Sequence, residues 1–283
     1  MPKIINAPRL VQRAGTTGSC RMQSTKPTLN NKPDIVDISS KSKEKNSSLA
    51  EFFELTTTAL GLTVGVKKAL ELPPINPDMT LADVNAHFKD IFLNENLSLG
   101  ETKVMIDRYK ELESIEDDEE YARAVYREAK ANYGLRNTVS ELKLIDEISK
   151  GNNYKIDGYA DPLGCVTISM NNRTRAQLFN TIHHELRHVK QHIYAFNYAP
   201  DTYVEYSQPK NMSIPKECFE FYFGNEASLD NIPKSKHKYA KKCVEGMIGY
   251  KSASKGTKNY AVQFVEKDAF SAGDRMLEIM KSV

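Results

Sequence analysis

The chain has 283 residues, enough to bury a sizeable core as one large domain or two smaller ones. Its 40% hydrophobic and 27% charged residues are ordinary for a soluble protein, and its formal net charge of +2 argues against a dedicated nucleic-acid-binding protein. The four cysteines lie far apart with no Cys-x-x-Cys spacing, which argues against a disulfide framework and against a cysteine-ligated zinc. No apolar run is long enough to cross a membrane, so no transmembrane segment is expected.

Residues 1–46 are expected to form a disordered basic leader, because they are rich in Ser, Thr, Pro, Asn and Lys and nearly free of aromatic residues. The first acidic residue is Asp34. In composition the leader resembles a mitochondrial presequence, and equally the unfolded leader by which a bacterial effector is loaded into an injection apparatus. A plain solvated tail is the third alternative. We therefore expect a soluble protein that is secreted or injected, with a mitochondrial or cytoplasmic location as the alternative.

Residues 47–150 are expected to form a helical region, which either stands alone as a targeting domain or packs onto the rest of the chain. Thr80 and Ser98 are typical N-cap residues, and Tyr133-Gly134 is a typical helix end. Thr138 and Glu141 have the spacing of a capping box. The expected helices cover 51–72, 81–93, a segment that starts near 100, 116–130, and a segment that follows Thr138 and reaches 150.

Residues 151–283 have a different pattern, which begins with two short strands over 154–159 and 166–170 around a turn at 161–164. A helix is then expected from Asn172 to Asn197, with an apolar stripe along one face. The segment 199–259 is expected to be irregular, and a final helix is expected over 260–281, with Val262 in its apolar stripe. The predicted fold class is α+β: mainly helical, with a small antiparallel sheet before the long helix.

The sharpest chemical signal lies in the middle of that long helix, where His184-Glu185-Leu186-Arg187-His188 forms an H-E-x-x-H motif. Residues at i and i+4 of a helix lie on one face, about one turn apart, so the two imidazoles can bind one Zn²⁺. Glu185 then lies beside a water on the open side of the metal. The motif predicts a zinc site in which Glu185 is the catalytic base.

A catalytic zinc needs a third protein ligand, and the nearby histidines do not provide one. His192 stands about 12 Å from His184 along the helix, and His183 points roughly 100° away from it. A carboxylate is therefore expected. Glu266, at the edge of the apolar stripe of the last helix, is favoured over Glu226, whose neighbour Asp230 would orient a liganding histidine. Glu217 and Glu220 are weaker candidates, and a salt-bridged surface charge is the alternative interpretation of Glu266.

An H-E-x-x-H helix followed by a downstream glutamate resembles the gluzincin branch of the zinc metallopeptidases. The segment Tyr260…Glu266-Lys267-Asp268-Ala269 is similar to the glutamate-bearing helix of several bacterial members, and the resemblance spans roughly residues 154–281. It implies a zincin-like catalytic core over residues 151–283, with His184, His188 and Glu266 holding Zn²⁺. It also implies an edge strand before the metal helix, antiparallel to a bound peptide, for which residues 165–169 are the expected segment. The strict thermolysin-type Asn-Glu-x-x-Ser-Asp pattern is broken after Asn225-Glu226.

The implied activity is that of a zinc-dependent metalloendopeptidase, a bacterial toxin or effector, that acts on a protein or peptide as a monomer. Two alternatives remain: a zinc hydrolase of a non-protein amide or a cell-wall peptide, and an inactive zincin-fold protein with a binding or regulatory role. The group that stabilises the oxyanion is left open among Arg187, Tyr250, Tyr260 and His237.

Overall fold

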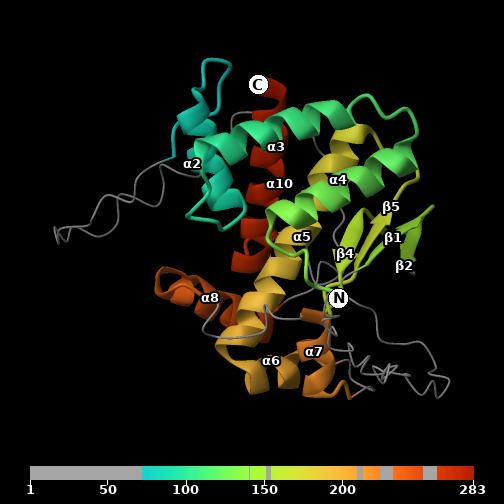
Figure 1. The fold of residues 1–283 in the computed structure, drawn as a ribbon. Coiled ribbons are helices and arrows are strands. Elements are labelled where there is room, and N and C mark those ends of the chain that lie inside the picture. Colours follow the sequence, from blue (N-terminus) through green and yellow to red (C-terminus); the bar gives the residue numbers. More distant parts are fainter. Residues whose placement is uncertain (1–71, 140, 151–153, 209–212, 224–231, 251–259) are drawn as a thin grey trace, which may run out of the picture. The chain divides into compact units, whose positions relative to one another are not determined.

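The computed structural model describes residues 72–283 apart from 140, 151–153, 209–212, 224–231 and 251–259 (Figure 1). The basic leader and nearly all of the helix expected over 51–72 lie outside these residues, as do Glu226 and Asp230. The structure is mainly helical with a small sheet, as the α+β prediction requires at this coarse level. None of the described helices has the length and apolar character needed to span a membrane.

Three helices come first in the described chain, and local signals position each of them. Thr80 and Ser98 close capping boxes at the starts of α2 and α3, and the Asp117 side chain accepts from the backbone of Glu120 at the start of α4. Gly134, with a φ of 70°, follows the last turn of α4. These helices were predicted and are confirmed: α2 (Leu81–Ile91), α3 (Leu99–Leu112) and α4 (Asp118–Asn132).

A three-stranded mixed sheet follows, with the order β1-β5-β4. In its centre, β5 (Val166–Ser169) pairs in parallel with β1 (Leu142–Ile145) and antiparallel with β4 (Gly158–Ala160). A separate antiparallel pair joins β2 (Ile148–Lys150) to β3 (Tyr154–Ile156). The strand predicted over 166–170 is confirmed as β5, whereas the one predicted over 154–159 is divided into β3 and β4, which belong to different sheets. Gly164 has a φ of 84° in the turn between β4 and β5.

The prediction of a helix that reaches residue 150 is wrong, because β1 and β2 occupy this segment. Leu142 and Leu144 alternate with exposed neighbours, which is a strand pattern, and the Thr138 hydroxyl donates to the Leu135 carbonyl instead of capping a helix. The sheet is therefore mixed and not purely antiparallel. The expectation of an edge strand over 165–169 is also wrong, since β5 lies between β1 and β4.

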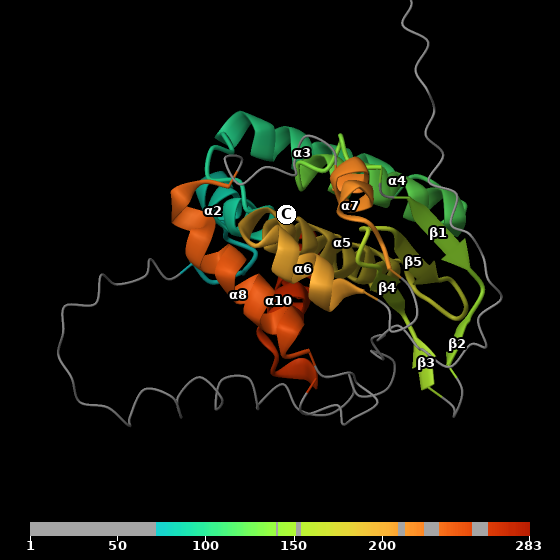
Figure 2. The same ribbon diagram turned by 90° about the horizontal axis from the view of Figure 1, so that it is seen from below.

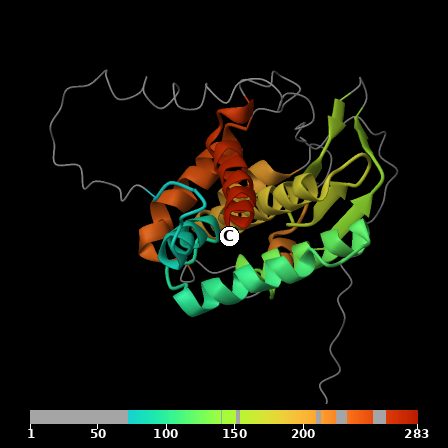
Figure 3. The same cartoon turned by 90° about the horizontal axis from the view of Figure 1, so that it is seen from above.

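Helix α5 (Arg175–Tyr198) carries the motif and begins at a capping box formed by Thr174 and Gln177. Its apolar stripe is buried, as predicted. The C-terminal helix α10 (Phe264–Ser282) packs more extensively on α5 than any other element does. Figures 2 and 3 show α10 lying against α5, with the strands on another side of α5.

The prediction that residues 199–259 are irregular is wrong as well. The described part of this segment contains several short helices, of which α6 (Pro200–Ser207) and α8 (His237–Ile248) pack on α5. Aromatic side chains such as Phe219 and Phe223 anchor them in the core. These helices are too short, and the spacing of their apolar residues too irregular, for the sequence to show a clear helical period. Between α6 and α8 lie α7 (Lys216–Phe223) and the 3₁₀ turn η3 (Lys234–Lys236). Val262 is 64% exposed, since it lies before α10 begins.

The described residues on both sides of residue 151 share one core. Helix α4 packs on α5, α2 packs on α10, and β1 pairs with β5. The buried cluster includes Phe88 from α2, Val125 from α4, Ile168 from β5 and Met276 from α10. The helices α2–α4 thus form part of the support of α5 rather than a separate body.

Helix α10 approaches α5 closely at Gly273. A Cβ placed there would lie 2.8 Å from Asn180 Oδ1 and 2.9 Å from the Asn180 backbone oxygen. We predict that Gly273→Ala lowers the free energy of unfolding by about 1–3 kcal/mol, because a backbone carbonyl cannot move aside. The matched control is Gly100→Ala in the first turn of α3, where the added carbon meets only Ser98 Oγ at 4.0 Å. It should be neutral or stabilising by up to about 1 kcal/mol. Urea unfolding measures both, and equal shifts would contradict this packing.

Candidate metal centre

The two histidines of the motif face each other on α5. His184 Nε2 and His188 Nε2 lie 3.1 Å apart, and the ring centroids are 4.7 Å apart. His184 is fully buried, and the His188 side chain is 12% exposed. One donor atom each from His184, Glu185 and His188 lies within 4.8 Å of the others, so this group could hold a metal ion.

Glu266 reaches the same point from the first turn of α10. Its Oε2 lies 3.7 Å from His184 Nε2 and 3.5 Å from His188 Nε2, and the residue is 1% exposed. The structure therefore brings together the three residues that the sequence analysis favoured as ligands. Glu217 and Glu220 are exposed on α7.

The charges of these groups are strongly coupled. Burial opposes ionisation of Glu266, but the charges of His188 and His184, together with hydrogen bonds from His188 and Tyr260, outweigh it and lower the pKa of Glu266 to about 2. Burial likewise opposes protonation of His188, while Glu266 raises the pKa of this imidazole to about 9. Burial, with the charge of His188, lowers the pKa of His184 to about 3. A proton on His188 thus occupies the place where a metal cation would balance Glu266.

Glu185 is buried in the same region without a hydrogen-bond partner for either carboxylate oxygen among the described residues. Burial raises the pKa of Glu185 to about 8, although the charge of His188 and the backbone N–H of Ala160 in β4 oppose this shift. Burial therefore favours the protonated form of Glu185 at neutral pH when no cation is bound, and a metal ion beside it would favour the carboxylate that a catalytic base requires.

Gln191, one turn after His188, orients the second imidazole. Its Oε1 lies 2.9 Å from His188 Nδ1, while its Nε2 donates to the Val265 carbonyl at 2.9 Å and to Asp268 Oδ2 at 2.8 Å. Because the amide nitrogen faces two acceptors, Oε1 must face the imidazole. His188 Nδ1 therefore donates, which leaves Nε2 toward His184 and Glu266. The i, i+3 spacing was the only sequence signal for Gln191, and the sequence analysis missed it.

Arg187 serves the packing of the helices and not the candidate centre. Its guanidinium donates to both carboxylate oxygens of Asp268 at 2.7 Å and to the Ile91 carbonyl at 2.6 Å. The Tyr239 hydroxyl donates to Asp268 Oδ2 at 2.6 Å. This buried network joins α2, α5, α8 and α10. It commits Arg187 to a structural ion pair, so Arg187 is a poor candidate for stabilising an oxyanion.

Two of the other candidates for that role lie beside Glu266. The Tyr250 hydroxyl donates to Glu266 Oε1 at 2.9 Å, and the buried Tyr260 ring lies 6.1 Å from that of Tyr250. The Tyr260 hydroxyl also helps to lower the pKa of Glu266. His237 Nε2 instead lies 3.2 Å from the Ile232 carbonyl.

The two remaining histidines of α5 do not take part. His183 is enclosed by aromatic rings, with Phe179 at a centroid distance of 4.7 Å, and neither of its ring nitrogens has a partner among the described residues. Burial lowers the pKa of His183 to about 3, so it is a neutral core residue. His192 Nδ1 lies 2.9 Å from the Tyr203 hydroxyl.

The sequence matches no protein-family model, no curated protein and no solved structure.

Metal content distinguishes the two candidate third ligands. In protein purified without chelators, we expect Glu266→Ala to lose the bound ion, because it removes the only carboxylate within 4 Å of both imidazole nitrogens in the described residues. Glu226→Ala and the exposed control Glu217→Ala should keep it. Mass spectrometry of the metals gives the number of metal ions per chain. Loss of the ion in Glu226→Ala alone would assign the third ligand to Glu226.

The Gln191 contact has its own consequence. We predict that Gln191→Leu weakens metal binding roughly 10–100-fold, since His188 loses the acceptor that fixes its tautomer. The matched control is Lys190→Leu, on the opposite face of α5. Competition with a chromophoric zinc chelator measures both affinities, and unfolding of the metal-free variants reports any general loss of stability. Equal affinities in the two variants would rule out an orienting role for Gln191.

Proposed function

We propose that this protein is a zinc-dependent metalloendopeptidase of the gluzincin type, in which His184, His188 and Glu266 hold the metal. The observation that carries the proposal is the triangle of donor atoms, with sides of 3.1, 3.5 and 3.7 Å. A tetrahedral zinc with ligand bonds of about 2.0–2.1 Å separates its ligand atoms by roughly 3.3–3.4 Å. The three side chains therefore have the spacing that one such ion requires.

The chemistry of the donors supports zinc in particular. Two imidazoles and one carboxylate form a ligand set typical of hydrolytic zinc sites, and it leaves a fourth position for water. Glu266 Oε2 lies 3.7 Å from His184 Nε2 and 3.5 Å from His188 Nε2, while Oε1 accepts from the Tyr250 hydroxyl. When bound, the zinc supplies an acidic water and polarises the substrate carbonyl.

Glu185 is the group that moves the proton. It accepts a proton from the attacking water and transfers it to the nitrogen of the departing amine. Two features support this role: Glu185 lies beside both imidazoles, and neither of its carboxylate oxygens has a hydrogen-bond donor within bonding distance in the described residues.

An extended peptide is the substrate that fits the neighbouring strand. The ladder bonds Ser169 N–H to Asp157 O and Asp161 N–H to Cys165 O place Gly158 and Ala160 at the alternate positions of β4. Their backbone groups consequently point away from β5, toward the side of the sheet where no described strand follows. Ala160 is also the residue whose N–H influences Glu185. A peptide paired with β4 would bring its carbonyl groups beside the candidate centre.

Delivery to another cell is the part of the proposal that depends on the leader. The basic, nearly non-aromatic composition of residues 1–46 suits an unfolded export signal, and we propose on this ground that the protein acts as a secreted or injected bacterial effector or toxin.

Glu185→Gln tests the proposed role directly. The amide has the same shape but cannot accept a proton, so we expect zinc to stay bound while hydrolysis of casein or of a peptide library falls by about 10²–10⁴-fold. Glu217→Gln, an exposed change on α7, should leave the rate unchanged. A chelator should abolish wild-type activity, and added zinc should restore it.

Three other results would redirect the proposal. Undiminished turnover by Glu185→Gln would exclude Glu185 as the base. Wild-type protein that hydrolyses only non-peptide amides or cell-wall peptides would place it among the other zinc hydrolases. Wild-type protein that binds zinc and hydrolyses none of these substrates would indicate a regulatory role.

A further inference from the structure

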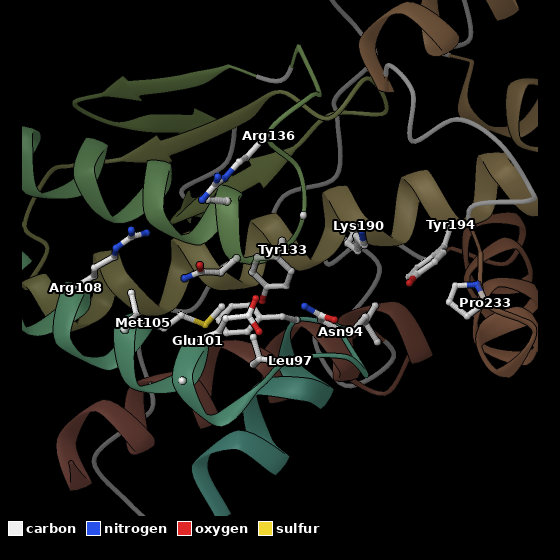
Figure 4. Close-up of a pocket in the computed structure, with 17 residues that line it drawn as sticks. Asn94, Leu97, Glu101, Met105, Arg108, Tyr133, Arg136, Lys190, Tyr194 and Pro233 are labelled. Carbon is white, nitrogen blue, oxygen red and sulfur yellow. The ribbon is translucent and has the colours of Figure 1, made fainter. Parts of the chain in front are cut away.

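A concave site lies on the face of α5 that points away from the candidate centre. Lys190 and Tyr194 of α5 line it together with residues of α3, of α4 and of the segments that follow α2 and α4, and they enclose about 680 Å³ (Figure 4). Lys190 is about 200° around the helix from His188. Cavities of this size are typical of small-molecule sites.

Part of the pocket wall is apolar and aromatic. Leu97 and Tyr133 are buried in its wall, and Met105 lies beside them. The Tyr133 ring is held in place, because its hydroxyl donates to the His183 carbonyl at 3.2 Å and Phe92 packs edge-on against it at 5.1 Å. Val104, 48% exposed, also lines the pocket. A rigid aromatic wall favours a ligand with a flat apolar body.

The charge of the lining is strongly positive. Arg108, Arg136 and Lys190 face a single carboxylate, that of Glu101. Glu101 is already engaged, since it accepts from Ser98 N–H at 2.8 Å and from Ser98 Oγ at 2.7 Å in the cap of α3. The residues that line the pocket therefore carry more positive than negative charges.

The three cations differ in their surroundings. Arg108 has a partly solvated partner in Glu128 at 3.5 Å, and Arg136 forms no ion pair with any described residue. The Lys190 ammonium lies 5.5 Å from the centre of the Tyr194 ring. Figure 4 shows Arg108 and Arg136 on one side of Tyr133, and Lys190 and Tyr194 on the other.

We propose that this pocket binds a small organic anion with an aromatic body. Its acidic group lies between the Arg108 and Arg136 guanidinium groups, which are suited to planar, bidentate recognition of carboxylate or phosphate. Its aromatic body lies along Tyr133 and extends toward Tyr194. The recognised chemistry is the pairing of a negative head group with a flat apolar ring, and both a carboxylate and a phosphate ester provide it.

Calorimetric titration of the full chain tests this site. The probes are 2-naphthoate and 1-naphthyl phosphate, and the matched control is 2-naphthylmethylammonium, which has the same ring and the opposite charge. We expect saturable binding of at least one anion with one site per chain, and at least tenfold weaker binding of the cation. Tighter binding of naphthoate would identify a carboxylate ligand, and tighter binding of the naphthyl ester would identify a phosphate. No saturable binding of either anion, or equal affinity for the cation, would overturn the proposal.

Charge reversal locates the binding site. Arg108→Glu combined with Arg136→Glu should weaken anion binding at least tenfold, because it replaces attraction by repulsion at the head group. The matched control is Arg127→Glu, an exposed arginine of α4 that does not line the pocket. All three arginines are exposed, so the variants should fold. Equal affinity of the double variant and the control would show that the anion binds elsewhere.

Discussion

The packing of α10 across α5 is the contact on which the candidate metal centre depends, because the two imidazoles come from one helix and the carboxylate from the other. Two features of the sequence allow this contact. Gly273 has no side chain to separate the helices, and Asp268 accepts from both Arg187 and Gln191 of α5. Gln191 also contacts His188. The Arg187–Asp268 ion pair between α5 and α10 is therefore linked, through Gln191, to the orientation of the His188 imidazole.

Several ionisable groups are buried around the candidate metal centre. Burying an ionised group without a partner lowers the free energy of unfolding by roughly several kcal/mol. Here Glu266 raises the pKa of His188, so the imidazolium form balances the carboxylate when no cation is bound, while neither carboxylate oxygen of Glu185 has a donor within hydrogen-bonding distance in the described residues. A divalent cation between the imidazoles would take over the pairing of Glu266 and release the proton of His188. The arrangement is thus more easily explained by metal binding than by stability alone.

Much of the supporting structure could be predicted because its signals are local. Thr174 and Gln177 mark the start of α5, and the apolar stripe sets which face is buried, so the position of the H-E-x-x-H motif within the helix followed from the sequence. The choice of Glu266 rested on its place at the edge of an apolar stripe. Its distance from the imidazoles could not be predicted, since it depends on how two helices far apart in the chain pack together.

The incorrect predictions have the same origin. Strand β1 is short and pairs in parallel with β5, and no pattern in residues 142–145 predicts that partner. In the same way, the contact of Gln191 with the Val265 carbonyl involves a backbone atom of another helix. The pocket behind α5 also combines side chains from several elements, so no motif marks it.

X-ray absorption at the zinc edge, on protein purified without chelators and supplied with one equivalent of zinc, would identify the ligands of the ion. A centre of two histidines and one glutamate should give scattering from two imidazoles together with oxygen at about 2.0–2.1 Å and no sulfur at about 2.3 Å. A shell that contains sulfur, or one without imidazole scattering, would contradict a centre built from His184, His188 and Glu266.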